Sequence, residues 1–140
     1  MTTAKEVREE FNRMSYDGNI TDDKFVSFKD LLGKTIVDIY GAETGSEVIA
    51  FVCDDGSKYI MYHEQDCCES VSVEDICGDQ SALLYYPITK AEEASNEGET
   101  DEGTCTWTFY HLATIKGYVT IRWYGESNGY YSESVFVCKL

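Results

Sequence analysis

Apolar groups in the first 33 residues recur at helical spacing. Three of them fall at i, i+4 and i+7, namely Val7, Phe11 and Met14. This spacing predicts an amphipathic helix over residues 3–14, with Thr3 as the N-cap and Glu6 completing a capping box. A shorter second helix is expected over residues 22–32, just before Gly33.

From residue 34 onward the pattern changes to runs rich in β-branched and aromatic residues, separated by turn signals. Strands are expected over residues 34–40, 47–53, 58–63, 70–73, 88–94, 104–114, 118–124 and 131–138. The sequence Asp54-Asp55-Gly56 is a strong hairpin signal between two of them. The pattern indicates an α+β fold, mainly antiparallel β-sheet able to curl into a half-barrel, with one or two N-terminal helices.

One segment interrupts this pattern with polar and acidic residues alone. Residues 95–103 read SNEGETDEG and contain no apolar anchor. Like charges repel one another and favour an extended chain, so this segment is expected to be a mobile acidic loop. The chain is therefore expected to form one β-rich domain over residues 34–140, with residues 1–33 as a helical extension.

The charge distribution narrows the range of partners. The net charge is −15, yet residues 103–140 carry two acids and three bases. Binding to the phosphate backbone of nucleic acid is not expected from so acidic a chain, although carboxylates that mimic nucleic acid remain open. No run is long and apolar enough to cross a membrane, and the N-terminus has no apolar signal region, so a cytoplasmic location is expected.

The six cysteines and the polar stretch around residue 65 raise the question of metal or redox chemistry. The zinc candidates are His63, Cys67, Cys68 and Cys77. Adjacent cysteines in an extended chain point to opposite faces, and no second cysteine pair is spaced to complete a site. We therefore expect no metal and six reduced thiols, with a Cys67–Cys68 disulfide as the alternative.

The simplest interpretation of this stretch is a polar turn in which His63, Gln65 and Asp66 hydrogen-bond the backbone. A role in ligand binding is kept for the same three residues. The neighbouring carboxylates, Glu69 among them, are interpreted as a solvated acidic face. The alternative is a small metal-dependent enzyme centred on His63, Asp66 and Cys67.

The last third of the chain is rich in aromatic side chains around a lone arginine. In the strand over residues 118–124, Tyr118, Arg122 and Tyr124 share the face opposite the expected core face. The candidate binding residues are Tyr110, Lys116, Tyr118, Arg122, Tyr124, Asn128, Tyr130 and Glu133. Either Glu133 on the neighbouring strand pairs with Arg122, or the guanidinium meets a ligand phosphate or a partner carboxylate.

Two stretches of the chain carry a resemblance to a known family. They are YHEQDCCESVSVEDICGD at residues 62–79, and TWTFY, ATIKGYVTIRW and SNGYYSE within residues 106–133. Over residues 34–140 the chain resembles an uncharacterised domain family associated with bacteriophage and prophage genomes. The resemblance implies a phage-type accessory protein and supplies no catalytic residues.

No Walker, GxGxxG, GxSxG or HExxH motif is present, so no catalytic residue and no cofactor are assigned and an enzyme is disfavoured. The expectation is a non-enzymatic binding protein that inhibits or sequesters a component of a host defence system in the host cytoplasm. Its expected partner is a host protein. A nucleotide-like ligand held by a protein sponge is an alternative, and a virion or assembly component is a third class.

Overall fold

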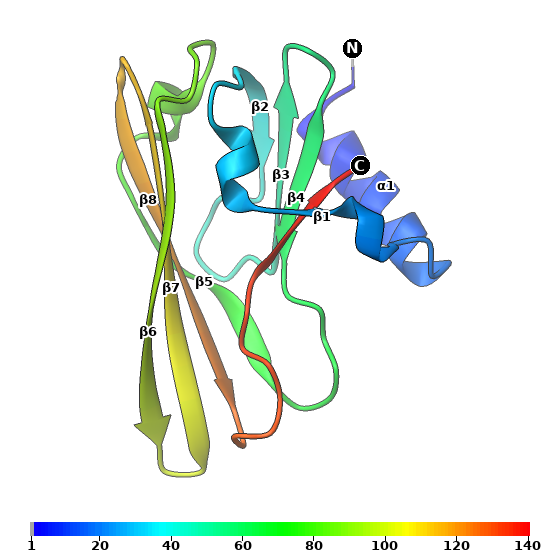
Figure 1. Ribbon diagram of the computed structural model, residues 1–140, viewed down its shortest axis with the longest axis vertical. Helices are drawn as coiled ribbons and strands as arrows, with labels where there is room; N and C mark the ends of the chain where they lie inside the picture. Colours follow the sequence, from blue (N-terminus) through cyan, green and yellow to red (C-terminus); the bar gives the residue numbers. More distant parts are fainter. Residues whose placement is uncertain (1) are drawn as a thin grey trace.

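Two antiparallel sheets face each other, and one helix covers the outer side of the first sheet (Figure 1). This arrangement comes from a computed structural model, which describes residues 2–140. The first sheet, sheet A, has the order β1 (Phe25–Val26), β9 (Phe136–Lys139), β4 (Lys58–Tyr62), β3 (Val48–Cys53) and β2 (Ile36–Tyr40). The second, sheet B, has the order β5 (Ser70–Cys77), β8 (Gly117–Ser127), β7 (Gly103–Thr114) and β6 (Lys90–Thr100). The expected α+β fold with mainly antiparallel sheet is confirmed, and the two sheets stay open.

The N-terminal helix forms as the apolar spacing predicts. Helix α1 spans Ala4–Tyr16, and Thr3 and Glu6 form the capping box. Val7 and Phe11 are buried against the outer face of sheet A. Strand β3 is apolar on both faces because it packs under this helix on one side and against sheet B on the other. No helix among the described residues is long and apolar enough to cross a membrane.

The second helix expected over residues 22–32 is replaced by two short 3-10 helices, Asp22–Lys24 and Phe28–Leu31, on either side of β1. Phe25 and Val26 pair with β9 at the edge of sheet A. An aromatic and a β-branched residue suit this edge position, and the pairing interrupts the helix. A third 3-10 helix, Gln80–Leu83, follows β5.

The expected acidic loop is wrong in its secondary structure. Residues 95–100 belong to β6, which pairs residue by residue with β7 from Lys90 to Thr100. The acidic side chains of Glu97 and Glu99 share one face of this edge strand and are exposed, so neither needs to enter the core, and β7 supplies the backbone hydrogen bonds. The composition of this segment therefore did not predict its secondary structure, which depends on pairing with the neighbouring strand.

The two sheets differ in length. Strands β7 and β8 have 12 and 11 residues, whereas β2, β3, β4 and β9 have four to six. Sheet B therefore extends beyond sheet A, at the lower end of Figure 1. The chain crosses from β8 to β9 at that end through residues 128–135, of which 131–135 were expected to be strand.

Candidate functional site: an acidic groove

The inner face of sheet B changes character along its length. Where sheet A covers it, the side chains are buried and largely apolar, and they include Tyr110, Leu112, Val119, Ile121 and Trp123. Beyond that region, the β7 positions of the same face are Thr108, Thr106 and Thr104, and the facing β6 positions are Ser95, Glu97 and Glu99. The uncovered end of the sheet is thus built from hydroxyls and carboxylates.

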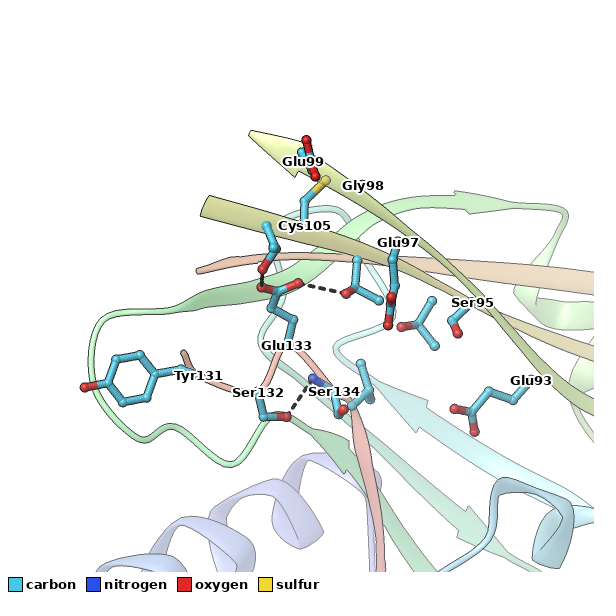
Figure 2. Close-up of a pocket in the computed structure, with 14 residues that line it drawn as sticks. Glu93, Ser95, Glu97, Gly98, Glu99, Cys105, Tyr131, Ser132, Glu133 and Ser134 are labelled. Atoms are coloured by element: carbon cyan, nitrogen blue, oxygen red, sulfur yellow. Dashed lines mark hydrogen bonds between the residues drawn. The ribbon is translucent and has the colours of Figure 1, made fainter. Parts of the chain in front are cut away.

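These side chains line a cavity of about 610 Å³ between β6, β7 and the crossing segment 131–135 (Figure 2). Four carboxylates line it: Glu93, Glu97, Glu99 and Glu133. Six serine and threonine side chains line it as well: Ser95, Thr104, Thr106, Thr108, Ser132 and Ser134. No lysine or arginine is among its lining residues. We call this cavity the acidic groove.

Glu133 is the fixed carboxylate of the acidic groove. It accepts hydrogen bonds from Thr104 Oγ1 at 2.6 Å and from Thr106 Oγ1 at 2.7 Å, the two dashed lines at Glu133 in Figure 2. It also accepts one from the Ser127 hydroxyl. Burial acts to raise the pKa of Glu133, but the three hydroxyl donors outweigh it and the pKa is lowered. The carboxylate is therefore held ionised in one position.

A glycine makes this position possible. A Cβ atom placed on Gly125 would lie 3.0 Å from Glu133 Cβ and 3.1 Å from its carbonyl oxygen. Only a residue without a side chain lets the crossing segment approach strand β8 this closely. Gly125 thus brings Glu133 within reach of the Thr104, Thr106 and Ser127 hydroxyls.

The inner end of the acidic groove meets the core at Glu93 and Tyr110. Tyr110 is fully buried, with its ring 4.6 Å from that of Phe28. Burial raises the pKa of Glu93. Among the described residues, Tyr110 Oη and Trp123 Nε1 are buried atoms without a hydrogen-bond partner. The groove therefore ends beside a buried hydroxyl that is still unsatisfied.

The polar turn at residues 63–69 forms around the carboxylate of Glu69, which the sequence analysis interpreted as part of a solvated acidic face. His63 Nε2 lies 2.9 Å from Glu69 Oε2, and both side chains are buried. The other ring nitrogen, Nδ1, lies 2.7 Å from the carbonyl oxygen of Ser134. Gln65 Nε2 donates to the carbonyl oxygen of Glu69 at 2.7 Å, and the backbone N–H of Asp66 donates to its carboxylate. The turn is thus anchored to the crossing segment that walls the groove.

The four zinc candidates do not come together. Cys67 and Cys68 are joined to each other as a disulfide, so the expectation of six reduced thiols differs from the structure at these two residues. The chain turns at this point instead of extending, and the two sulfurs therefore need not lie on opposite faces. Cys77 is a free, exposed thiol at the end of β5. Among residues 2–140, no three His, Cys, Asp or Glu side chains are grouped so that they could hold a metal ion.

Catalysis at His63 also lacks the required geometry. Both ring nitrogens already have hydrogen-bond partners, so neither is available to a substrate or to a metal without the loss of one of these bonds. The alternative of an enzyme centred on His63, Asp66 and Cys67 therefore gains no support from the arrangement of these side chains.

Three of the candidates, Tyr118, Arg122 and Tyr124, lie on the outer face of sheet B. Arg122 Nε is 2.7 Å from Glu74 Oε1, so its partner is a carboxylate of β5 and not Glu133. Tyr124 packs against Trp107 with ring centroids 5.3 Å apart and donates to Glu126 at 3.0 Å. The guanidinium is thus already paired, with a different carboxylate from the Glu133 that the sequence analysis offered as one alternative.

The remaining candidates are dispersed over the molecule. Tyr110 faces the core, on the opposite side of the sheet from Arg122. Lys116 lies over the Tyr86 ring at 5.2 Å. Tyr118 and Tyr130 are exposed, and Asn128 Oδ1 accepts from the backbone N–H of Tyr130 in the turn after β8. Of these residues, Tyr118 shares the outer face of β8 with Arg122, and the others lie elsewhere.

Sequence reasoning missed most of the acidic groove. Glu93, Glu97 and Glu99 were assigned to a strand end and a loop, and the threonines were interpreted only as strand formers. A signal was present: polar residues occupy every second position from 93 to 99 and again from 104 to 108. In two strands joined by a tight turn, such alternations place the polar side chains on one shared face.

The comparisons with known proteins give one match. Residues 29–137 match the family model of a domain of unknown function, DUF7448. No curated protein and no solved structure matches the chain. The matched region contains β2 to β8 and leaves α1 outside it. Because the match covers well over half of the chain, the protein belongs to the DUF7448 family.

Proposed function

We propose that this protein is a non-enzymatic binding protein that captures a positively charged segment of a partner protein in the acidic groove. The observation that carries the proposal is the lining of the groove, with four carboxylates and no basic side chain around about 610 Å³. Like charges brought together in a partly enclosed space are stabilised by a cation that enters it.

The polar chemistry of the groove suits a donor-rich cation such as an arginine side chain. The carboxylates only accept hydrogen bonds, and a guanidinium group only donates them. Charge-assisted bonds between the two are among the strongest hydrogen bonds in proteins. Glu133 is already fixed by three hydroxyls, so its own orientation adds little entropic cost to binding.

A nucleotide-like ligand is less well supported. Phosphate groups would be repelled by the four carboxylates of the groove. On the outer face, Arg122 is paired with Glu74 and would have to leave that partner to meet a phosphate. We therefore favour binding of a basic protein segment over sequestration of a nucleotide-like ligand.

The resemblance to bacteriophage and prophage domains suggests a biological setting for this binding. In that setting the protein is an accessory protein of the host cytoplasm, which inhibits or sequesters a component of a host defence system. Occupying a basic surface of that component would block the anionic ligand the surface normally takes. The net charge of −15 would speed the encounter with such a surface.

A hexa-arginine peptide tests the proposal by isothermal titration calorimetry at low salt. Glu97→Gln combined with Glu99→Gln should weaken its binding by about tenfold or more, because two charge-assisted contacts are lost. The matched control is Glu92→Gln combined with Glu126→Gln, which removes the same charge from the other face of sheet B. Equal weakening by both pairs would show that only net charge matters and would overturn the proposal.

A further inference from the structure

The two oxygens of the Glu69 carboxylate make four hydrogen-bond contacts. Its Oε1 accepts from the backbone N–H of Cys67 at 2.8 Å and from Gln65 Nε2 at 3.2 Å. Its Oε2 accepts from the backbone N–H of Asp66 at 3.1 Å and lies 2.9 Å from His63 Nε2. Three of these contacts are N–H donors whatever the tautomer of His63, and together they favour the ionised carboxylate. Burial acts to raise the pKa of Glu69, but these donors lower it to about 2.

The contacts of His63 then fix its protonation. Glu69 is ionised and only accepts, so Nε2 of the ring must carry a hydrogen. The carbonyl oxygen of Ser134, 2.7 Å from Nδ1, is also only an acceptor, so Nδ1 must carry a hydrogen as well. A neutral imidazole has only one N–H, and therefore both hydrogen bonds form only if His63 is an imidazolium.

The charged groups around the ring favour this cation. Glu69 contacts it directly, and Glu64 on the same segment and Glu47 before β3 line the cavity that His63 also lines. No lysine or arginine is among the residues that line this cavity. On the remaining side, the ring of Phe136 lies 6.5 Å away. The other charged side chains that line this cavity are thus all carboxylates.

His63 connects this buried pair to the acidic groove. Its Nδ1 partner is Ser134, which lines the groove beside Glu133 and Ser132 (Figure 2). The imidazolium therefore ties the turn at residues 63–69 to the wall that carries the fixed carboxylate of the groove.

We propose that His63 is a buried imidazolium that positions the wall of the acidic groove and makes cation binding there dependent on pH. Loss of its proton, with the Glu69 bond kept, would leave the Nδ1 lone pair facing the Ser134 carbonyl oxygen. These two acceptors repel, and residues 131–135 would be released, so Glu133 would leave the Thr104 and Thr106 hydroxyls. The binding consequence rests on the proposed function, whereas the protonation of His63 does not.

The sign of this effect separates it from titration of the groove itself. Rising pH ionises carboxylates such as Glu93, and this alone strengthens binding of a cation. Release of the wall weakens binding as the pH rises. A loss of affinity on the alkaline side is therefore the mark of His63.

The protonation state is measured directly by the side-chain ¹⁵N signals of the two histidines. His63 should show two protonated ring nitrogens at pH 7. His111 is the internal control, because its Nδ1 lies 2.9 Å from the Thr120 hydroxyl, which can donate as well as accept. The amide signals of Glu133 and Ser134 should shift with the loss of the second His63 proton. A His63 ring with one bare nitrogen at pH 7, or amide signals that do not follow its titration, would overturn the inference.

The consequence for binding is measured with the hexa-arginine peptide, whose guanidinium groups stay charged at every pH used. The wild-type affinity should fall at least threefold across the His63 titration. His63→Gln should bind weakly and show no loss of affinity on the alkaline side, and His111→Gln should keep the wild-type profile. If His63→Gln does not fold, the profiles of wild type and His111→Gln decide the question.

The two proposals fail in different ways. A peptide that binds at no pH would overturn the proposed function, while the ¹⁵N and amide signals would still test the role of His63. A peptide that binds equally well before and after His63 loses its proton would overturn the regulation and leave the groove's function standing.

Discussion

The two halves of the inner face of sheet B are built on the same strands and face the same way, yet one half forms core and the other lines a cavity. The half under sheet A ends at Tyr110 and Trp123 and is a sealed apolar core. The half beyond it begins at Thr108 and is a polar cavity. The boundary lies where the shorter strands of sheet A end, so the length of one sheet decides how much of the other is free to bind.

The energetics of the two halves differ accordingly. Apolar groups in the covered half stabilise the fold by roughly 25 cal/mol for each Å² removed from water. In the uncovered half, the polar groups are satisfied by one another, as Glu133 is by three hydroxyls. We therefore expect mutations in the covered half to change stability and mutations in the uncovered half to change binding.

The largest effect is expected from Leu112→Ala in the covered half. Leu112 is fully buried, and a leucine cut to alanine in a core costs about 2–5 kcal/mol. Ser95→Ala, on the same face in the uncovered half, should change the free energy of unfolding by less than about 0.5 kcal/mol. Denaturant unfolding measures both values, and similar losses would remove the distinction between the two halves.

The sequence predicted the elements whose patterns are local. The period of Val7, Phe11 and Met14 and the capping box gave α1, and the alternation in residues 104–124 gave β7 and β8. It failed for residues 95–100 because the partner strand, and not composition, makes that segment a strand. A strand at the edge of a sheet needs no apolar side chain of its own.

The site was less predictable because it depends on contacts between distant residues. One alternative placed Glu133 beside Arg122, but Arg122 pairs with Glu74 of β5, and Glu133 accepts from Thr104 on the opposite face of the sheet. The Glu69–His63–Ser134 connection joins segments 71 residues apart. No spacing along the chain encodes that approach.

A second prediction concerns Gly125 and tests whether the crossing segment is held close to β8 at this position. A methyl group there would meet Val71 Cγ2 at 2.9 Å and Glu133 Cβ at 3.0 Å. Overpacking of this kind costs about 1–3 kcal/mol, and Gly125→Ala should also displace Glu133 and weaken binding of the hexa-arginine peptide. Denaturant unfolding and calorimetry measure the two effects. Stability and affinity that both stay at wild-type values would show that the crossing segment is not held against β8.

A third prediction uses the lowered pKa of Glu133. A carboxylate whose pKa is lowered by folding adds stability above its unfolded-state pKa of about 4.3, and this is lost as the pH falls. The melting temperature of the wild type should therefore fall between pH 5 and pH 3. Glu133→Gln should show a shallower fall, because it no longer binds that proton.

The control for this titration is Glu102→Gln, in the exposed turn between β6 and β7, which should follow the wild-type curve. A Glu133→Gln curve as steep as that of the wild type would mean that Glu133 is not held by the three hydroxyls.

The smallest effect is expected on the outer face, at Arg122. The Arg122–Glu74 pair is more than one third exposed, and such surface pairs contribute up to about 1 kcal/mol. Arg122→Ala should therefore lower the free energy of unfolding only slightly, and Arg122→Lys should lose less because it keeps the charge. Neither substitution should weaken binding of the hexa-arginine peptide, because Arg122 lies on the opposite face of the sheet from the groove. If either variant changed partner binding tenfold while stability stayed within this range, the aromatic outer face would be the binding surface. The proposal that the acidic groove binds the partner would then be wrong.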